Sequence, residues 1–156
     1  MIPLFLGLTL ANLAALVTAA VFGYLALSHE SLRQWHMLAG ALATLICCAV
    51  HCVVFTYFIA TAKWIQHAVN VKQLDAELTK PTRSFKSQAL PAALVAIGVV
   101  FITAFVGAAT FSYGLRPSIH HVLAIASLVI NALCAAVEYR AIVRNGALID
   151  RILAQL

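Results

Sequence analysis

The sequence predicts an all-α integral membrane protein, a bundle of four transmembrane helices with its N- and C-termini on the cytoplasmic side. Of the 156 residues, 63% are hydrophobic and only 10% are charged, which leaves too few polar residues to cover a water-facing surface. A membrane-spanning helix needs about 20 predominantly apolar residues, and four stretches of the chain reach that length. The basic residues, which hold short loops on the cytoplasmic side, gather in only some of the connections.

We expect the four spans and one long cytoplasmic connection in a single transmembrane domain that covers residues 1–156. Apolar residues continue at helical spacing past Lys63, so the second helix is predicted to extend beyond the membrane. The third helix is predicted to begin near Pro91, since a proline in the first turn loses no helical hydrogen bond. No internal sequence repeat is evident. The spans are predicted near 3–27, 38–62, 90–113 and 121–143, with the connection at 63–89.

The ten lysines and arginines are divided unequally between the two sides of the predicted bundle. The loops opposite the termini hold only Arg33 and Arg116. Short loops rich in basic residues stay inside, so the topology is that of a multi-pass protein of the bacterial inner membrane. The net charge of +5 follows from this topology and does not indicate nucleic-acid binding. The other eight are Lys63, Lys72, Lys80, Arg83, Lys86, Arg140, Arg144 and Arg151.

The expected partners follow from the large apolar surface of so small a chain. Four helices leave much surface facing the lipid bilayer, whose anionic headgroups would meet the basic end. We also expect contact with other membrane subunits or with further copies of the chain in a homo-oligomer.

Polar side chains inside the predicted spans lie on particular helix faces. Ionisable groups in a membrane are costly and by default mark a functional site that faces the bundle interior. At 100° per residue, His36 and His51 share one face of the second helix, about 22 Å apart at about 1.5 Å per residue. The fourth helix collects its polar residues on one face at spacings of three to seven residues, namely His120, Ser127, Asn131, Cys134 and Glu138.

An outer layer of histidines is predicted from His36 and His120, with His121 as the substitute for His120. Histidines at a membrane boundary often reach out to water. The alternative is a ligand pair, because two imidazoles on different helices, facing across a gap, provide the axial ligation that a b-type haem needs. The gap would be left by Gly40, Ala43 and Ala124. Small-residue faces on the first and third helices would let the helices approach closely or leave room for a ligand.

An inner layer is predicted from Asn12, His51 and Glu138. Counted from the outer boundary, the three lie within about 5 Å of one another along the membrane normal. A deep histidine needs hydrogen-bond partners, and Glu138 is the natural one. The pair is interpreted as a structural bond that fixes the helix register, or as a second haem ligand, a proton relay or a metal site that Glu138 ligates or orients.

Copper or zinc is the alternative cofactor to haem. Cys47, Cys48 and Cys52 lie within one and a half turns of His51, and thiolates with imidazole suit these metals. The spacing matches no specific motif, and cysteine is also common in apolar interiors. The candidate metal ligands, taken over both layers, are His36, His51, His120 and Glu138.

The second helix resembles those of the diheme transmembrane cytochromes. In these proteins, such as the haem-binding anchors of succinate dehydrogenase and the four-histidine ascorbate-type cytochromes, helices carry histidines near both membrane faces. His36 and His51 fit this spacing. The fourth helix departs from it, because Asn131 and Glu138 stand where a second histidine would follow His120. The resemblance covers architecture and one spacing, and it does not extend to a second bis-histidine haem in one protomer.

The sequence thus predicts a small redox protein that binds b-type haem through interior histidines and passes electrons, with quinone as the candidate partner. Two other classes fit the same residues. One is a cofactor-free structural or assembly subunit of a membrane complex, and the other is a small proton or ion transporter that uses His51 and Glu138. The chain shows no nucleophile motif and no phosphate-binding loop, so an autonomous hydrolase or transferase is not expected.

Overall fold

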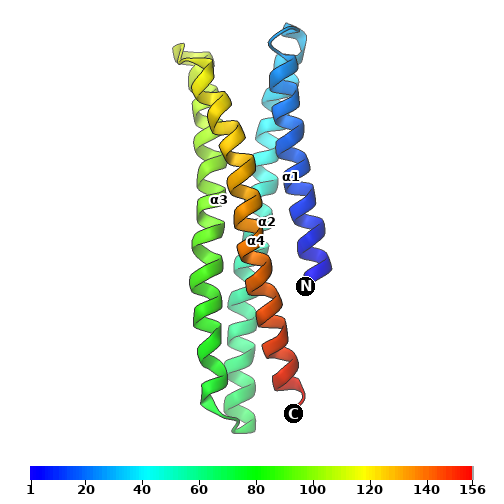
Figure 1. Ribbon diagram of the computed structural model, residues 1–156, viewed down its shortest axis with the longest axis vertical. Coiled ribbons are helices and arrows are strands. Elements are labelled where there is room, and N and C mark those ends of the chain that lie inside the picture. The colour runs from blue at the N-terminus through cyan, green and yellow to red at the C-terminus, as the bar shows by residue number, and fades with distance from the viewer. Residues whose placement is uncertain (156) are drawn as a thin grey trace.

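The computed structural model describes residues 1–155. Most of them lie in four long antiparallel helices (Figure 1). All four are long and apolar enough to cross a membrane, as the composition predicts. The described chain therefore has the architecture of a multi-pass, all-helical membrane protein. The helices are α1 (Ile2–Leu25), α2 (Arg33–Lys72), α3 (Lys80–Tyr113) and α4 (Pro117–Leu153).

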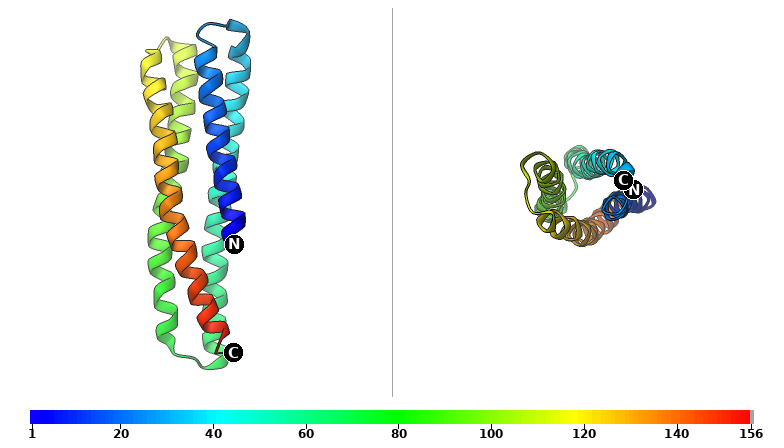
Figure 2. Two further views of the ribbon diagram at one scale, coloured as in Figure 1. Left: turned by 45° about the vertical axis from the view of Figure 1, so that its right-hand side comes forward. Right: turned by 90° about the horizontal axis from the view of Figure 1, so that it is seen from above.

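The helices pack as two hairpins placed side by side. In the first hairpin α1 lies against α2, and in the second α3 lies against α4. The hairpins meet where α2 contacts α3 and where α1 contacts α4, so α2 and α4 lie diagonally across the bundle (Figure 2). This diagonal matters for the site, because α2 and α4 carry the predicted functional residues.

The helices differ in length, and α1 begins midway along the bundle (Figure 1). The 40 residues of α2 reach about 60 Å, roughly twice the thickness of a hydrocarbon core. The helix continues past Lys63, as predicted, while its extension beyond the membrane stays a prediction. It ends at Lys72, where Gln73 takes a left-handed conformation with φ 50°. Beyond the start of α1 the core is built from α2, α3 and α4 and includes Ile65, Phe85 and Ile152.

The predicted start of the third helix near Pro91 is wrong. The helix begins at Lys80, with Pro81 in its first turn, and Pro91 lies inside it. Pro81 meets the same condition as the predicted Pro91, because the first N–H groups of a helix have no intrahelical partner. The segment before Pro91 is held as helix by packing, since Phe85 and Ala89 are buried against the core.

The connection expected at 63–89 is consequently reduced to residues 73–79, because both helices extend into it. Within it a short 3₁₀ turn, Ala76–Thr79, begins after Asp75, whose side chain accepts a hydrogen bond from the Glu77 backbone N–H at 2.9 Å. At the other end of the bundle, Gly114 closes α3 with φ 68°, and a second 3₁₀ turn, Glu30–Leu32, leads into α2.

The two hairpins repeat one another at a fixed distance along the chain. Cys47 Sγ donates a hydrogen bond to Asn131 Oδ1 at 3.5 Å, and Asn145 Nδ2 donates to Thr61 Oγ1 at 2.9 Å. In both pairs the partners are 84 positions apart along the chain. If the two hairpins are equivalent, residues at matching positions can contact each other only beside the symmetry axis that relates the hairpins. The two contacts therefore indicate a pseudo-two-fold axis that runs along the bundle. Further buried residues at the same separation are Phe5 and Ala89, Asn12 and Ala96, Ala43 and Ser127, and Phe58 and Ile142.

Candidate functional site

The outer histidines of α2 and α4 are brought together by the bundle. His36 and His120 are equivalent residues of the two hairpins, separated by the same 84 positions as the contact pairs above. Their ring centroids lie 5.8 Å apart, with the ring planes at 68°. Because α2 and α4 are diagonal, the two rings meet near the pseudo-two-fold axis.

Each of these imidazoles is fixed by the neighbouring helix of its own hairpin. His36 Nδ1–H donates to the Ala19 carbonyl oxygen at 2.9 Å, and His120 Nδ1–H donates to the Thr103 carbonyl oxygen at 3.1 Å. A carbonyl only accepts, so Nδ1 carries the proton and the neutral ring keeps its lone pair on Nε2. A backbone carbonyl on the second ring nitrogen is also the usual support of a metal-ligating histidine.

Two glycines give these rings their space. A Cβ on Gly23 would lie 2.8 Å from His36 Cε1, and a Cβ on Gly107 would lie 2.7 Å from His120 Cε1. Carbon atoms in van der Waals contact are about 3.5–4.0 Å apart, so a side chain at either glycine would force the imidazole to move. The glycine, the carbonyl four residues before it and the histidine thus form the same unit in both hairpins.

The other histidines near this end of the bundle stand apart from the pair. The His121 ring stacks on Tyr24 with centroids 6.2 Å apart, and it lies 6.4 Å from the His120 ring. His29 is exposed in the connection between α1 and α2. The structure therefore joins His36 with His120 and turns His121 toward α1.

A middle layer of hydrogen bonds ties α4 to α1 and α3. Asn131 Oδ1 accepts from Asn12 Nδ2 at 3.0 Å, and Asn131 Nδ2 donates to the Ser127 carbonyl oxygen at 2.9 Å. Ser127 Oγ and Thr103 Oγ1 share a hydrogen bond of 2.6 Å. Asn12 is therefore joined to Asn131, whereas the sequence placed it with His51 and Glu138.

The inner layer contains an acid and an imidazole in direct contact. His51 Nδ1 and Glu138 Oε1 are 2.8 Å apart, and the two residues are only 2% and 0% exposed. His51 Nε2 and Glu138 Oε2 are buried and have no hydrogen-bond partner among residues 1–155. Asn12 Oδ1 is in the same condition.

The predicted metal ligands form two separate pairs, one in each layer. Among residues 1–155 no group of three or more histidine, cysteine or acidic side chains could hold a metal ion. The thiol of Cys47 donates to the Asn131 side chain, whereas Cys48 is partly exposed and Cys52 is exposed. Copper or zinc at these cysteines thus stays a prediction that the described residues do not support.

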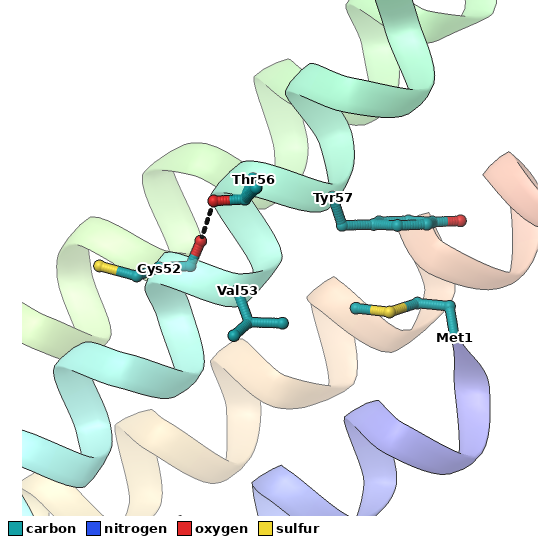
Figure 3. Close-up of a pocket in the computed structure, with 5 residues that line it drawn as sticks. All are labelled: Met1, Cys52, Val53, Thr56 and Tyr57. Atoms are coloured by element: carbon teal, nitrogen blue, oxygen red, sulfur yellow. Dashed lines mark hydrogen bonds between the residues drawn. The ribbon is translucent and has the colours of Figure 1, made fainter. Parts of the chain in front are cut away.

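A shallow hollow of about 340 Å³ lies where α1 begins against α2 (Figure 3). It is lined by Met1, Cys52, Val53, Thr56 and Tyr57, and it includes no residue of either histidine layer.

Several interior polar residues were not singled out as site candidates from the sequence. Asn145, which is 1% exposed and bonded to Thr61, continues the polar face of α4 seven residues beyond Glu138. The partnership of Gly23 and Gly107 with the histidines could have been found from the sequence, because each glycine precedes its histidine by thirteen residues.

Comparisons of the chain with protein-family models, with curated proteins and with solved structures gave no match. The functional argument therefore depends on the geometry of the two layers.

Proposed function

We propose that this protein is a membrane redox protein in which His36 and His120 hold one b-type haem between α2 and α4. The observation that carries the proposal is the repeated unit of carbonyl, glycine and histidine. Each hairpin presents one neutral imidazole with its Nε2 lone pair available, and the two rings come within 5.8 Å of each other.

The residues fit haem better than a bare metal ion. Two axial imidazoles complete the coordination of a haem iron, whereas a structural zinc site needs about four protein ligands. With metal–nitrogen bonds of about 2 Å, two imidazoles on one metal place their ring centroids about 6 Å apart. One turn deeper on α2, a Cβ on Gly40 would meet nothing within 4 Å, so no neighbouring side chain crowds the helix at that position.

The chain would act on the group through orientation and environment. The Ala19 and Thr103 carbonyls fix both ring orientations and increase the basicity of Nε2. The surrounding helices provide a low dielectric. Haem, when bound, would supply a one-electron Fe(III)/Fe(II) couple, and the protein would then pass electrons, with quinone as the candidate partner.

We also infer the orientation and assembly of the protein. The end of the bundle that carries the 73–79 connection holds eight of the ten basic residues, so we place this end and both termini in the cytoplasm of a bacterial cell. Large apolar side chains such as Leu10, Phe105 and Val122 face outward, and they would meet lipid, a second copy or another membrane subunit.

Absorbance spectra of the full chain, purified in mild detergent after expression with added haem, test the proposal. We expect a Soret band that shifts on reduction, together with about one iron per chain. His36→Ala and His120→Ala should each abolish or strongly weaken it, while His29→Ala and His121→Ala leave it in place. A purified, folded protein without Soret absorbance and without iron would refute haem binding and leave the structural-subunit and transporter classes.

A further inference from the structure

His51 and Glu138 are ionisable where the other hairpin has apolar residues. Their equivalents at a distance of 84 residues, the separation of the contact pairs on the axis, are Ala135 for His51 and Val54 for Glu138. Apolar residues therefore pack well at these two positions in the other half of the bundle. Helix packing alone does not explain an acid and an imidazole at this depth.

The pair also has hydrogen-bonding capacity that the protein does not use. One hydrogen bond joins Nδ1 and Oε1, while Nε2 and Oε2 are buried without partners in the described part of the chain. Buried polar atoms in native proteins are almost always satisfied, by ordered water where no protein group is available. Water at these two positions would complete the hydrogen bonding of the acid–imidazole pair.

The charges around the pair favour a neutral form. On α3, the stretch 89–100 contains no titratable side chain, and on α1 none occurs before Tyr24 at the far end. Cys52, Tyr139 and Arg140 are closest along α2 and α4, but all three are exposed. The buried titratable groups on these helices nearest to the pair are the thiols of Cys47 and Cys134, each one turn away. No lysine or arginine faces Glu138, so a carboxylate beside a neutral imidazole would be an uncompensated charge in the membrane interior.

We propose that Glu138 and His51 form a proton-binding site inside the membrane. The pair is a carboxylic acid hydrogen-bonded to a neutral imidazole, and its protons exchange with water bound at Oε2 and Nε2. In each exchange a proton passes from the acid or from Nε2–H to a water molecule and is replaced by a proton from another, so the charge of the pair is unchanged. The site is independent of haem at His36 and His120.

Infrared spectroscopy of the full chain in dodecyl maltoside, a detergent without carbonyl groups, tests this proposal at neutral pH. A solvent-exposed carboxyl group is ionised at that pH, and of the five acidic residues only Glu138 is buried. We expect a single carbonyl-stretching band of a protonated carboxyl, which moves to lower frequency within minutes in D₂O. Glu138→Gln should remove it, whereas the control Asp150→Asn should leave it.

Two outcomes would overturn the proposal. If no protonated-carboxyl band is found, Glu138 is ionised and the pair is a fixed ion pair. If the band is found but does not shift during a day in D₂O, the pair is a structural hydrogen bond that does not exchange protons with water. If Glu138→Gln does not fold, glutamate labelled with ¹³C in the unmodified chain assigns the band. His51→Ala provides a second readout, because loss of the hydrogen bond should move the band of Glu138 to higher frequency.

Discussion

Replacing Gly23 by alanine tests the geometry of the outer histidine directly. The new Cβ would lie 2.8 Å from His36 Cε1 and 3.0 Å from Nδ1, so the ring must move by most of an ångström. That movement stretches the 2.9 Å bond to Ala19, worth about 0.6–1.5 kcal/mol, and overpacking adds about 1–3 kcal/mol. The better helix propensity of alanine returns about 1 kcal/mol. We expect a net loss of about 1–3 kcal/mol.

The free energy of unfolding, measured by titrating the protein in mild detergent with sodium dodecyl sulfate, provides the assay. Gly98→Ala is the matched control on α3, because a Cβ there meets nothing within 4 Å, and it should be neutral or stabilise by up to about 1 kcal/mol. Gly107→Ala should resemble Gly23→Ala, since its Cβ would lie 2.7 Å from His120 Cε1. If Gly23→Ala and Gly98→Ala shift the unfolding free energy equally, the described packing of His36 is wrong.

Two more substitutions examine the interior hydrogen bonds with the same assay. A double-mutant cycle of Asn12→Ala and Asn131→Ala should give a coupling of about 0.6–1.7 kcal/mol for their 3.0 Å bond, and zero coupling would contradict it. Asn145→Ala should cost about 1–3 kcal/mol because it leaves the partly buried Thr61 hydroxyl without its Asn145 donor. Asn70→Ala, at an exposed position, should change stability by less than about 0.5 kcal/mol, and similar effects of the two would argue against the buried contact.

The number of helices and the long second helix could be predicted from the sequence because both depend on local composition. Twenty apolar residues can form only a helix in lipid, where each backbone group must be bonded within the segment. The start of α3 was misplaced because two prolines, Pro81 and Pro91, satisfy the same helix-start rule. The burial of Phe85 decides between them, and burial depends on the packing of other helices.

The interior partners were only partly predictable. Helical spacing placed His51 and Glu138 at one depth, and the structure has them in contact. Helical spacing also placed Asn12 at that depth, but Asn12 contacts Asn131 instead. Counting residues from a loop does not account for the tilt of a helix or for its offset along the bundle. The relation between the hairpins escaped sequence comparison because equivalent positions share burial and rarely identity.

The pseudo-two-fold axis connects the two proposals. Two equivalent hairpins place identical groups on opposite sides of their axis, which suits a ligand that takes the same bond from both sides, as an iron does from two imidazoles. An acid–base pair needs two different groups, so it requires the halves to differ at the positions that meet. His36 with His120 satisfies the first condition and His51 with Glu138 the second. The outer layer is therefore the one in which to look for a metal, and the inner layer the one in which to look for a proton.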